Sequence, residues 1–332
     1  DAEIEAVFVD CFSSDCQGSA AHPKHIGFSA SFDTSPLRSA EHVKFLAAFF
    51  DKDAEAQSIF DDTVRNYHAL QVAPGPDALT VAWIERSSWP SESFKISLAS
   101  YKQTYITDAG ALNVDAAALQ SQHPKFTLTH ILPDHPAAGQ ALTLPLDGLG
   151  GKANASAIFS HALAGVDIVI DMTYAMQSRD YGFDDFLSSF GLDRRSQLNF
   201  VANKKVFRID GTLSATNAWD WYEARLAHPE WVLRDLAQAI RGQGSSARYL
   251  RNIAKGELPN IITKDACGKQ LPSCSKVSSP SEVSSPYEIQ HVLLNEHHHH
   301  DHGHDHVHND QHLVSSAGRV AAGLWILAAA AW

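Results

Sequence analysis

The sequence predicts an α/β fold with two lobes, and three observations lead to this prediction. The chain has 332 residues, which is more than a single hydrophobic core usually serves. From residue 79 onward, apolar runs typical of strands alternate with segments of helical periodicity, which favours a parallel or mixed sheet covered on both faces. Between Ser39 and Leu70, apolar residues recur at spacings of three and four. This spacing predicts one long helix, or two helices broken near Asp51.

The remaining elements follow from local patterns along the chain. Strands are expected at residues 4–9 and 26–32, before the long helical segment, and the apolar run at 166–171 is the clearest buried strand. Pro36 is suited to an early helix position, with Asp33, Thr34 and Ser35 as possible caps. The other expected elements are strands at 79–84 and 205–209, and helices at 93–107, 153–164, 183–190, through Trp221 and Leu226, and at 232–240.

Composition and charge limit the classes of function. Hydrophobic residues make up 44% of the chain and charged residues 19%, which is typical of a folded globular protein. The formal net charge is −12. A nucleic-acid backbone or an acidic lipid surface would repel such a chain, so nucleic acid is excluded as an expected partner.

Several segments, taken in order, resemble a known family. They are SPL at 35–37 with AEHVKFLAAFFDKDAEA at 40–56, VAWI at 81–84, Tyr101-Lys102 before DAGA at 108–111, DIVID at 167–171, NKKVFRIDG at 203–211 and DWYEARL at 220–226. Their order resembles the class III periplasmic substrate-binding proteins, which feed transporters for vitamin B12, iron siderophores and haem. The resemblance implies two α/β lobes that close around a small ligand without catalysis, and a transporter or receptor as partner.

The same resemblance implies a division of the chain into parts. Residues 39–70 take the place of the helix that joins the two lobes, and residues 71–262 take the place of the C-terminal lobe. Only two strands precede the helix, so residues 1–38 are expected to be the remnant of an incomplete first lobe. Because the first residue is Asp1, a cleaved signal peptide and a longer missing stretch of that lobe are both open.

The C-terminal region adds features that bacterial members of that class lack. A Ser/Pro linker is expected at 263–296, a His-rich tract at 297–312 and an apolar anchor signal at 313–332. This architecture is similar to that of algal cobalamin acquisition proteins, which implies a secreted protein at the outer face of the plasma membrane that takes up cobalamin or a related corrin or iron chelate. The apolar end is shorter than the roughly 20 residues of a membrane span. Small residues before it favour a lipid (GPI) anchor, with a cut-off transmembrane helix as the alternative.

Aromatic and polar residues that follow the predicted strands form the candidate ligand site. Ligands of open α/β sheets bind beyond the carboxyl ends of the strands, and aromatic rings suit a broad, flat ligand such as a corrin. For each Trp singly, packing in the core is the alternative interpretation. The candidate ligand-binding residues are Trp89, Thr173, Tyr174, Asn217, Trp219 and Trp221.

The His-rich tract is a candidate metal site on a flexible tail. Imidazoles alternate there with carboxylates, a loose ligand set for a divalent metal such as iron or zinc. Surface metal capture by this tail is the alternative function, and a solvated tail without metal is the simpler interpretation. The candidate ligands are His297, His298, His299, His300, His302, His304, His306 and His308.

The cysteines and one glycosylation motif agree with a secreted chain. Cys11 lies near Cys16 and Cys267 near Cys274, which favours two local disulfides, with free thiols as the alternative. Asn154 begins an N-x-S motif in an expected Gly-rich loop. The sequence has no Gly-rich phosphate loop of the GxxxxGK type, no GxSxG and no HExxH, so no catalysis is predicted.

Overall fold

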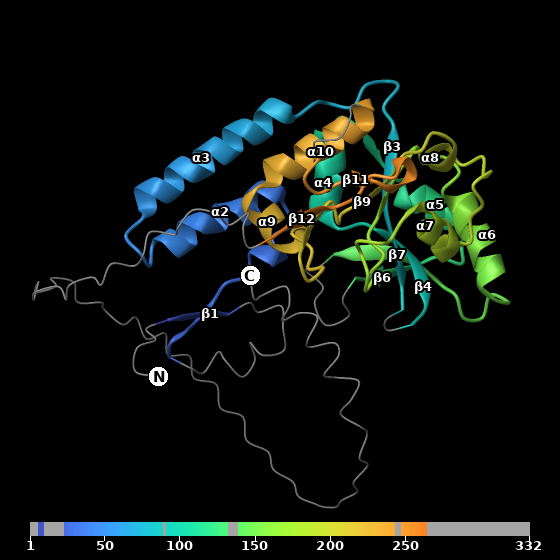
Figure 1. The fold of residues 1–332 in the computed structure, drawn as a ribbon, viewed down its shortest axis with the longest axis horizontal. Coiled ribbons are helices and arrows are strands. Elements are labelled where there is room, and N and C mark those ends of the chain that lie inside the picture. The colour runs from blue at the N-terminus through green and yellow to red at the C-terminus, as the bar shows by residue number, and fades with distance from the viewer. Residues whose placement is uncertain (1–5, 10–22, 89–90, 132–138, 243–246, 264–332) are drawn as a thin grey trace, which may run out of the picture.

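A mixed β-sheet forms the centre of the molecule. The computed structural model describes residues 6–9, 23–88, 91–131, 139–242 and 247–263 (Figure 1). The strands are ordered β11-β9-β8-β3-β4-β7-β6, and β5 also pairs with β3. They are β3 (Thr80–Ser87), β4 (Ser93–Ser97), β5 (Leu112–Asn113), β6 (Thr127–His130), β7 (Gln140–Pro145), β8 (Ile168–Asp171), β9 (Val206–Arg208) and β11 (Arg251–Asn252).

Strand direction divides this sheet into two halves. Strands β3, β8 and β9 run parallel, whereas β4, β7 and β6 pair antiparallel, and β11 pairs antiparallel with β9. The parallel strands therefore end at one edge of the sheet, where the loops after β8 and β9 begin. The predicted α/β class and the mixed sheet are confirmed.

Helices cover both faces of the sheet, because the strands alternate apolar residues between them. Val81 and Trp83 of β3 pack into one core cluster, and Ala82 and Ile84 into the other. The first cluster includes residues of α3 (Asp53–Leu70), α4 (Ser100–Asp108), α9 (Trp221–Ala227) and α10 (Pro229–Arg241). The second includes residues of α5 (Ala116–Gln122), α6 (Lys152–Ala162), α7 (Phe183–Phe190) and α8 (Asn199–Ala202).

The N-terminal region forms a smaller part of the fold. Strands β1 (Val7–Val9) and β2 (His25–Gly27) pair in parallel, and a 3-10 turn, η1 (Ala30–Phe32), leads into α2 (Pro36–Ala47). Ser35 takes the N-cap position of α2 and Pro36 lies in its first turn, as predicted, but the Ser35 side chain makes no capping hydrogen bond. The strand expected at 26–32 is therefore too long, since the chain turns after Gly27.

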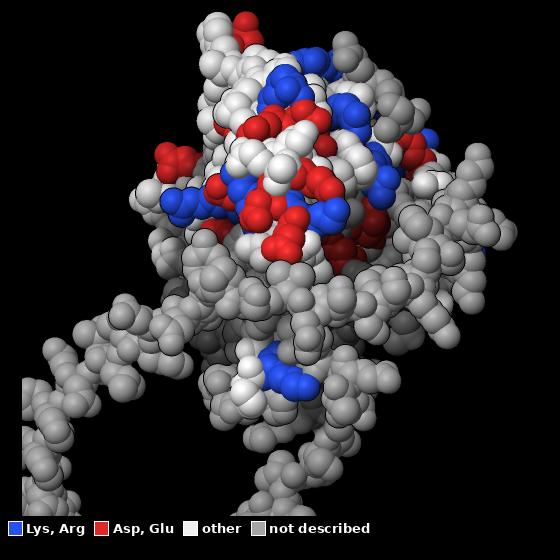
Figure 2. All heavy atoms as spheres, turned by 90° about the vertical axis from the view of Figure 1, so that its left-hand side faces the viewer, with Lys and Arg blue, Asp and Glu red and all other residues white. Residues whose placement is uncertain are grey.

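The expected interlobe helix at 39–70 is two helices, which corrects the single-helix interpretation. The chain reverses between α2 and α3 at Asp51, whose φ is 52°, and the amide of Lys52 donates to the Ala47 carbonyl at 3.1 Å. The break near Asp51 agrees with the second sequence interpretation. Figure 2 shows this end of the molecule with basic and acidic side chains interspersed. Lys44 pairs with Glu41 in α2, and Lys52 pairs with Glu55 at the start of α3.

The helix expected at 93–107 is wrong in its first part. Residues 93–97 form β4, and only the following α4 is helical. Phe94 and Ile96 face the second core cluster while Lys95 and Ser97 point to the other face, the two-residue alternation of a strand. Pairing with β3 and β7 on both sides overrides the helical spacing.

The segment after α10 also belongs to the folded part. Strand β10 (Thr212–Ser214) pairs in parallel with β12 (Asn260–Ile262), and η3 (Ile253–Lys255) packs on the second core cluster through Ile253. The N-x-S motif lies in the first turn of α6 rather than in a loop, with its Ser156 buried. The domain boundaries and the incompleteness of the first lobe stay predictions. The four cysteines and residues 264–332 lie outside the described residues.

Candidate functional site

Three aromatic rings lie together beyond the carboxyl ends of the parallel strands. The Trp219 ring centroid is 6.4 Å from that of Tyr174 and 5.8 Å from that of Tyr222. The ring planes of Trp219 and Tyr222 are only 14° apart, so these two rings stack. Tyr174 is 49% exposed and Tyr222 46%, whereas Trp219 between them is 7% exposed. We call these three residues the aromatic patch.

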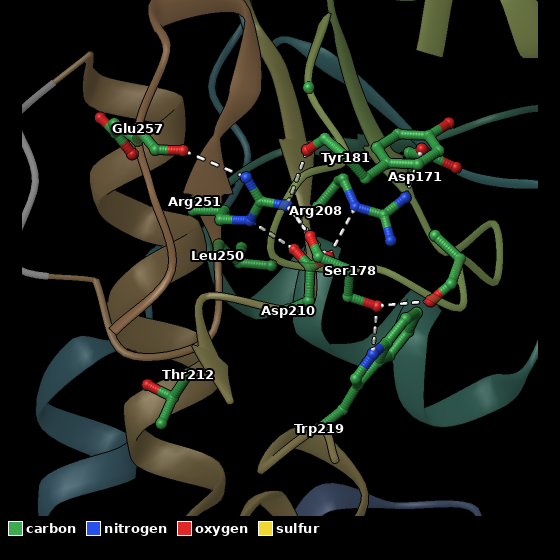
Figure 3. Close-up of polar contacts among 12 residues, drawn as sticks. Asp171, Ser178, Tyr181, Arg208, Asp210, Thr212, Trp219, Leu250, Arg251 and Glu257 are labelled. Carbon is green, nitrogen blue, oxygen red and sulfur yellow. Dashed lines mark hydrogen bonds and ion pairs between the residues drawn. The ribbon is translucent and has the colours of Figure 1, made fainter. Parts of the chain in front are cut away.

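Trp219 is fixed by a hydrogen bond to the loop after β8. Its indole N–H donates to Ser178 Oγ at 2.7 Å, and that hydroxyl donates in turn to the Ala175 carbonyl at 2.8 Å (Figure 3). Both Tyr174 and Ser178 belong to this loop. The bond therefore joins two separate loops that carry the patch.

A buried ionic network holds the same loop against the sheet. Arg208 at the end of β9 donates to Asp171 Oδ2 and Asp210 Oδ2, both at 2.8 Å, and to the Thr173 carbonyl at 3.0 Å. Burial alone would lower the pKa of Arg208, but the carboxylates of Asp171 and Asp210 raise it above its usual range. Arg208 thus stays charged inside the protein.

Arg251 of β11 completes the network (Figure 3). It donates to Asp210 Oδ1 at 2.6 Å, to the Ser178 carbonyl at 3.0 Å and to the Tyr181 carbonyl at 2.9 Å. The Tyr181 ring lies over the guanidinium of Arg208 at 3.9 Å. Two arginines and two aspartates therefore balance in charge, and they fix both ends of the loop between Asp171 and Tyr181.

The structure brings together only part of the predicted site. Trp219 and Tyr174 adjoin, as expected for residues beyond the strands. Thr173 is buried beneath them, where its hydroxyl accepts a bond from the Arg86 amide at 2.9 Å. Asn217 lies on the same side, since its amide donates to Gln177 Oε1 of the loop after β8 at 3.3 Å.

Trp221 does not lie at the patch. It is 1% exposed and packs in the first core cluster, 5.6 Å from the Trp83 ring and 5.7 Å from the Tyr249 ring. It has no surface to offer a ligand, so core packing, the alternative interpretation, describes this residue. Trp89 and the eight histidines of the predicted metal site lie outside the described residues.

Sequence reasoning missed Tyr222. It lies at the start of α9, three residues after Trp219, and its ring stacks on that of Trp219. Burial of its hydroxyl raises the pKa of Tyr222 above its usual range, so it is a neutral ring at physiological pH. The only signal in the sequence was its position close to Trp219, next to the loop after β9.

Within the part of the chain that the structure describes, no group of three or more His, Cys, Asp or Glu side chains is arranged to hold a metal ion. No helix of that part has the length and apolar character needed to cross a membrane.

Comparison with known proteins finds similarity only among solved structures. No protein-family model and no curated protein matches the chain. An ABC transporter substrate-binding protein from Listeria monocytogenes EGD-e is similar, with 15% identity over 72% of this chain and 77% of that chain, and a TM-score of 0.44. The periplasmic haem-binding protein HutB of Vibrio cholerae has 13% identity, coverages of 72% and 76%, and a TM-score of 0.44. The siderophore-binding protein FhuD of Vibrio cholerae, bound to Fe3+-Desferal, has 14% identity, coverages of 71% and 74%, and a TM-score of 0.38.

Proposed function

We propose that this protein binds a small, flat ligand on the aromatic patch, performs no chemistry on it, and passes it to a transporter or receptor. The observation that carries this proposal is an exposed pair of tyrosines on either side of a buried tryptophan, beyond the carboxyl ends of β8 and β9. Ligands of open α/β sheets bind at this edge. Cobalamin is the ligand we propose first, because its corrin ring is broad and flat, and an iron chelate of similar shape is the next choice.

The rigidity of the patch supports binding. The indole N–H of Trp219 is already hydrogen-bonded, and the loop that carries Tyr174 is tied down by Arg208 and Arg251. A ligand that stacks here does not have to order those side chains, so less of its binding free energy is lost to entropy. The two tyrosines supply apolar area with few rotatable bonds.

The polar groups beneath the patch act as supports in this proposal. Asp171 and Asp210 both accept hydrogen bonds from Arg208, and the Thr173 hydroxyl accepts one from a backbone amide. An acid, base or nucleophile needs a free position next to its substrate. Because these groups are already hydrogen-bonded inside the protein, the arrangement favours binding of a ligand over catalysis.

The test is direct binding by the purified chain. Cyanocobalamin, haem and ferric desferrioxamine are each titrated by equilibrium dialysis, with tryptophan fluorescence recorded in parallel. We expect saturable binding of at least one of them. Tyr174→Ala and Tyr222→Ala should each weaken that binding by about two- to tenfold, the usual contribution of one aromatic contact.

Leu258→Ala is the matched control, because Leu258 is 80% exposed and lies on the turn between η3 and β12. It should leave the affinity unchanged. Absence of saturable binding for all three ligands, or equal losses in the tyrosine variants and the control, would contradict the proposal.

We also propose that the His-rich tract captures a divalent metal at the cell surface, separately from the patch. Nine histidines lie between His297 and His312, interleaved with carboxylates. Deleting residues 297–312 should abolish zinc or iron binding and preserve cobalamin binding.

Release of the protein from cells by a phospholipase that cleaves GPI anchors would support surface anchoring through the apolar C-terminal segment, and retention would contradict it.

A further inference from the structure

Three buried cations lie on the sheet face that α4 and α9 cover. Lys95 of β4 is 7% exposed, Lys102 of α4 is 6% exposed and Arg225 of α9 is 9% exposed. Lysine and arginine are rarely buried to this degree unless a carboxylate neutralises them. We call these three residues the cationic group.

Within the described residues, only one of the three cations has a carboxylate partner. Lys95 Nζ lies 3.3 Å from Glu85 Oε1. In that part of the chain, Lys102 Nζ donates to Ser97 Oγ at 3.0 Å and forms no ion pair with a carboxylate. The buried Nε of Arg225 has no hydrogen-bond partner there. Among the described residues, Lys102 and Arg225 therefore have no carboxylate that neutralises them.

The pKa of Tyr101 reflects the positive electrostatic potential around the cationic group. Its ring lies 4.5 Å from the guanidinium of Arg225 and 5.5 Å from Lys102 Nζ. Burial alone would raise the pKa of Tyr101, but the charges of Lys102 and Arg225 outweigh it and lower the pKa. The potential thus favours a negative group even at a side chain that is normally neutral.

The backbone adds to the same potential. Helix α4 begins at Ser100, so Lys102 lies in its first turn, next to the positive end of the helix dipole. That turn holds no acidic residue, and no side chain caps it. Placing a lysine there costs stability, and a bound anion would recover that cost.

The cationic group adjoins the aromatic patch through α9. Tyr222 and Arg225 are three residues apart on that helix and therefore share a face. The Tyr222 ring stacks on Trp219. Tyr101 and Arg225 both act electrostatically on the Tyr222 hydroxyl. A ligand lying on the patch could therefore extend a side group toward Arg225.

We propose that the cationic group, with Arg225 and Lys102 as its uncompensated members, receives a carboxylate of the ligand whose flat face lies on the aromatic patch. This inference rests on the proposed function and adds the chemical class of the ligand: a flat molecule with an acidic side group. A guanidinium matches a carboxylate in shape, and Lys102 adds a second positive charge beside it.

The experiment uses ligand pairs that differ only in a carboxylate. The pairs are haem against its dimethyl ester, and a cobalamin monocarboxylic acid against cobalamin. Whichever ring binds, the acid form should bind at least about tenfold more tightly than its neutral partner, as for a hydrogen bond between two charged groups. Arg225→Gln and Lys102→Met should each reduce this preference severalfold and leave binding of the neutral form unchanged.

The neutral ligand also serves as the folding control, because a variant that still binds it has an intact patch. Lys255→Met, which removes an exposed lysine in η3, should leave the preference unaltered. Equal affinity of the wild-type protein for both members of a pair would overturn this inference and leave the proposed function intact. Binding of neither ring in any form would overturn both.

Discussion

Asp210 is the residue whose replacement tests the ionic network most sharply. It is fully buried and accepts one hydrogen bond from Arg208, at 2.8 Å, and two from Arg251, at 2.6 and 3.1 Å. In Asp210→Asn the side chain keeps nearly the same shape but loses its charge. Two arginines would then face Asp171 alone, so one buried positive charge would remain uncompensated.

The size of the effect follows from these contacts. Removing one partner of a buried ion pair costs about 3 to 5 kcal/mol, and the asparagine amide would also point N–H groups at the two guanidinium groups. We therefore expect the free energy of unfolding to fall by about 3 to 5 kcal/mol in Asp210→Asn. Urea unfolding at pH 7, followed by circular dichroism and tryptophan fluorescence, measures it.

An exposed ion pair provides the control for Asp210→Asn. Asp184 pairs with Arg194 at 2.6 Å, and both side chains are largely exposed to water, which screens the interaction. Asp184→Asn should therefore leave the urea midpoint almost unchanged. A loss below about 1 kcal/mol in Asp210→Asn would show that the network does not stabilise the fold as argued.

Three further predictions concern other parts of the fold. Burial raises the pKa of Asp235 to about 6, so between about pH 4 and 6 the folded state holds a proton that the unfolded state has released. The free energy of unfolding should therefore decline by about 3 kcal/mol as the pH rises through this range. Urea titrations of Asp235→Asn should not show this decline. A Cβ at Gly211 would lie 2.7 Å from the Tyr249 carbonyl oxygen, so Gly211→Ala should lower the thermal midpoint by several degrees, whereas Gly75→Ala, where nothing lies within 4 Å, should not; equal midpoints would refute the close approach. Asp51 has a φ of 52°, and Asp51→Gly should raise the free energy of unfolding by about 0.5 to 1 kcal/mol; a decrease would argue against a strained turn.

The parts of the fold that sequence patterns predicted are those where local and tertiary forces agree. Strand β8 is an apolar run that is buried on both faces, and α7 has the bounds that its pattern predicts. The helix prediction was wrong at β4, where Phe94 and Ile96 are two residues apart, the spacing of a strand. Pairing with β3 and β7 decided between them, and that information lies far away in the sequence.

The candidate site shows the same division. Trp219 and Trp221 both follow β9, and the rule for strand ends does not separate them. The structure does: Trp221, the first residue of α9, enters the core, whereas the next residue, Tyr222, lies at the patch with Trp219. That Lys102 and Arg225 have no carboxylate partner among the described residues could not be predicted, because it depends on every element that packs around them.

Helix α9 gives a reason why stacking and charge recognition would act together. It carries Tyr222 of the aromatic patch and Arg225 of the cationic group one turn apart. Asp220, just before the helix, is anchored by Arg248 at 2.9 Å, and Trp221 is fixed in the core. The distance between the stacking ring and the guanidinium is therefore set by a helix that cannot shift without breaking these contacts. If the proposed site is correct, a ligand must match that distance to use both groups, and the fold would select for the position of its acidic group as well as its presence.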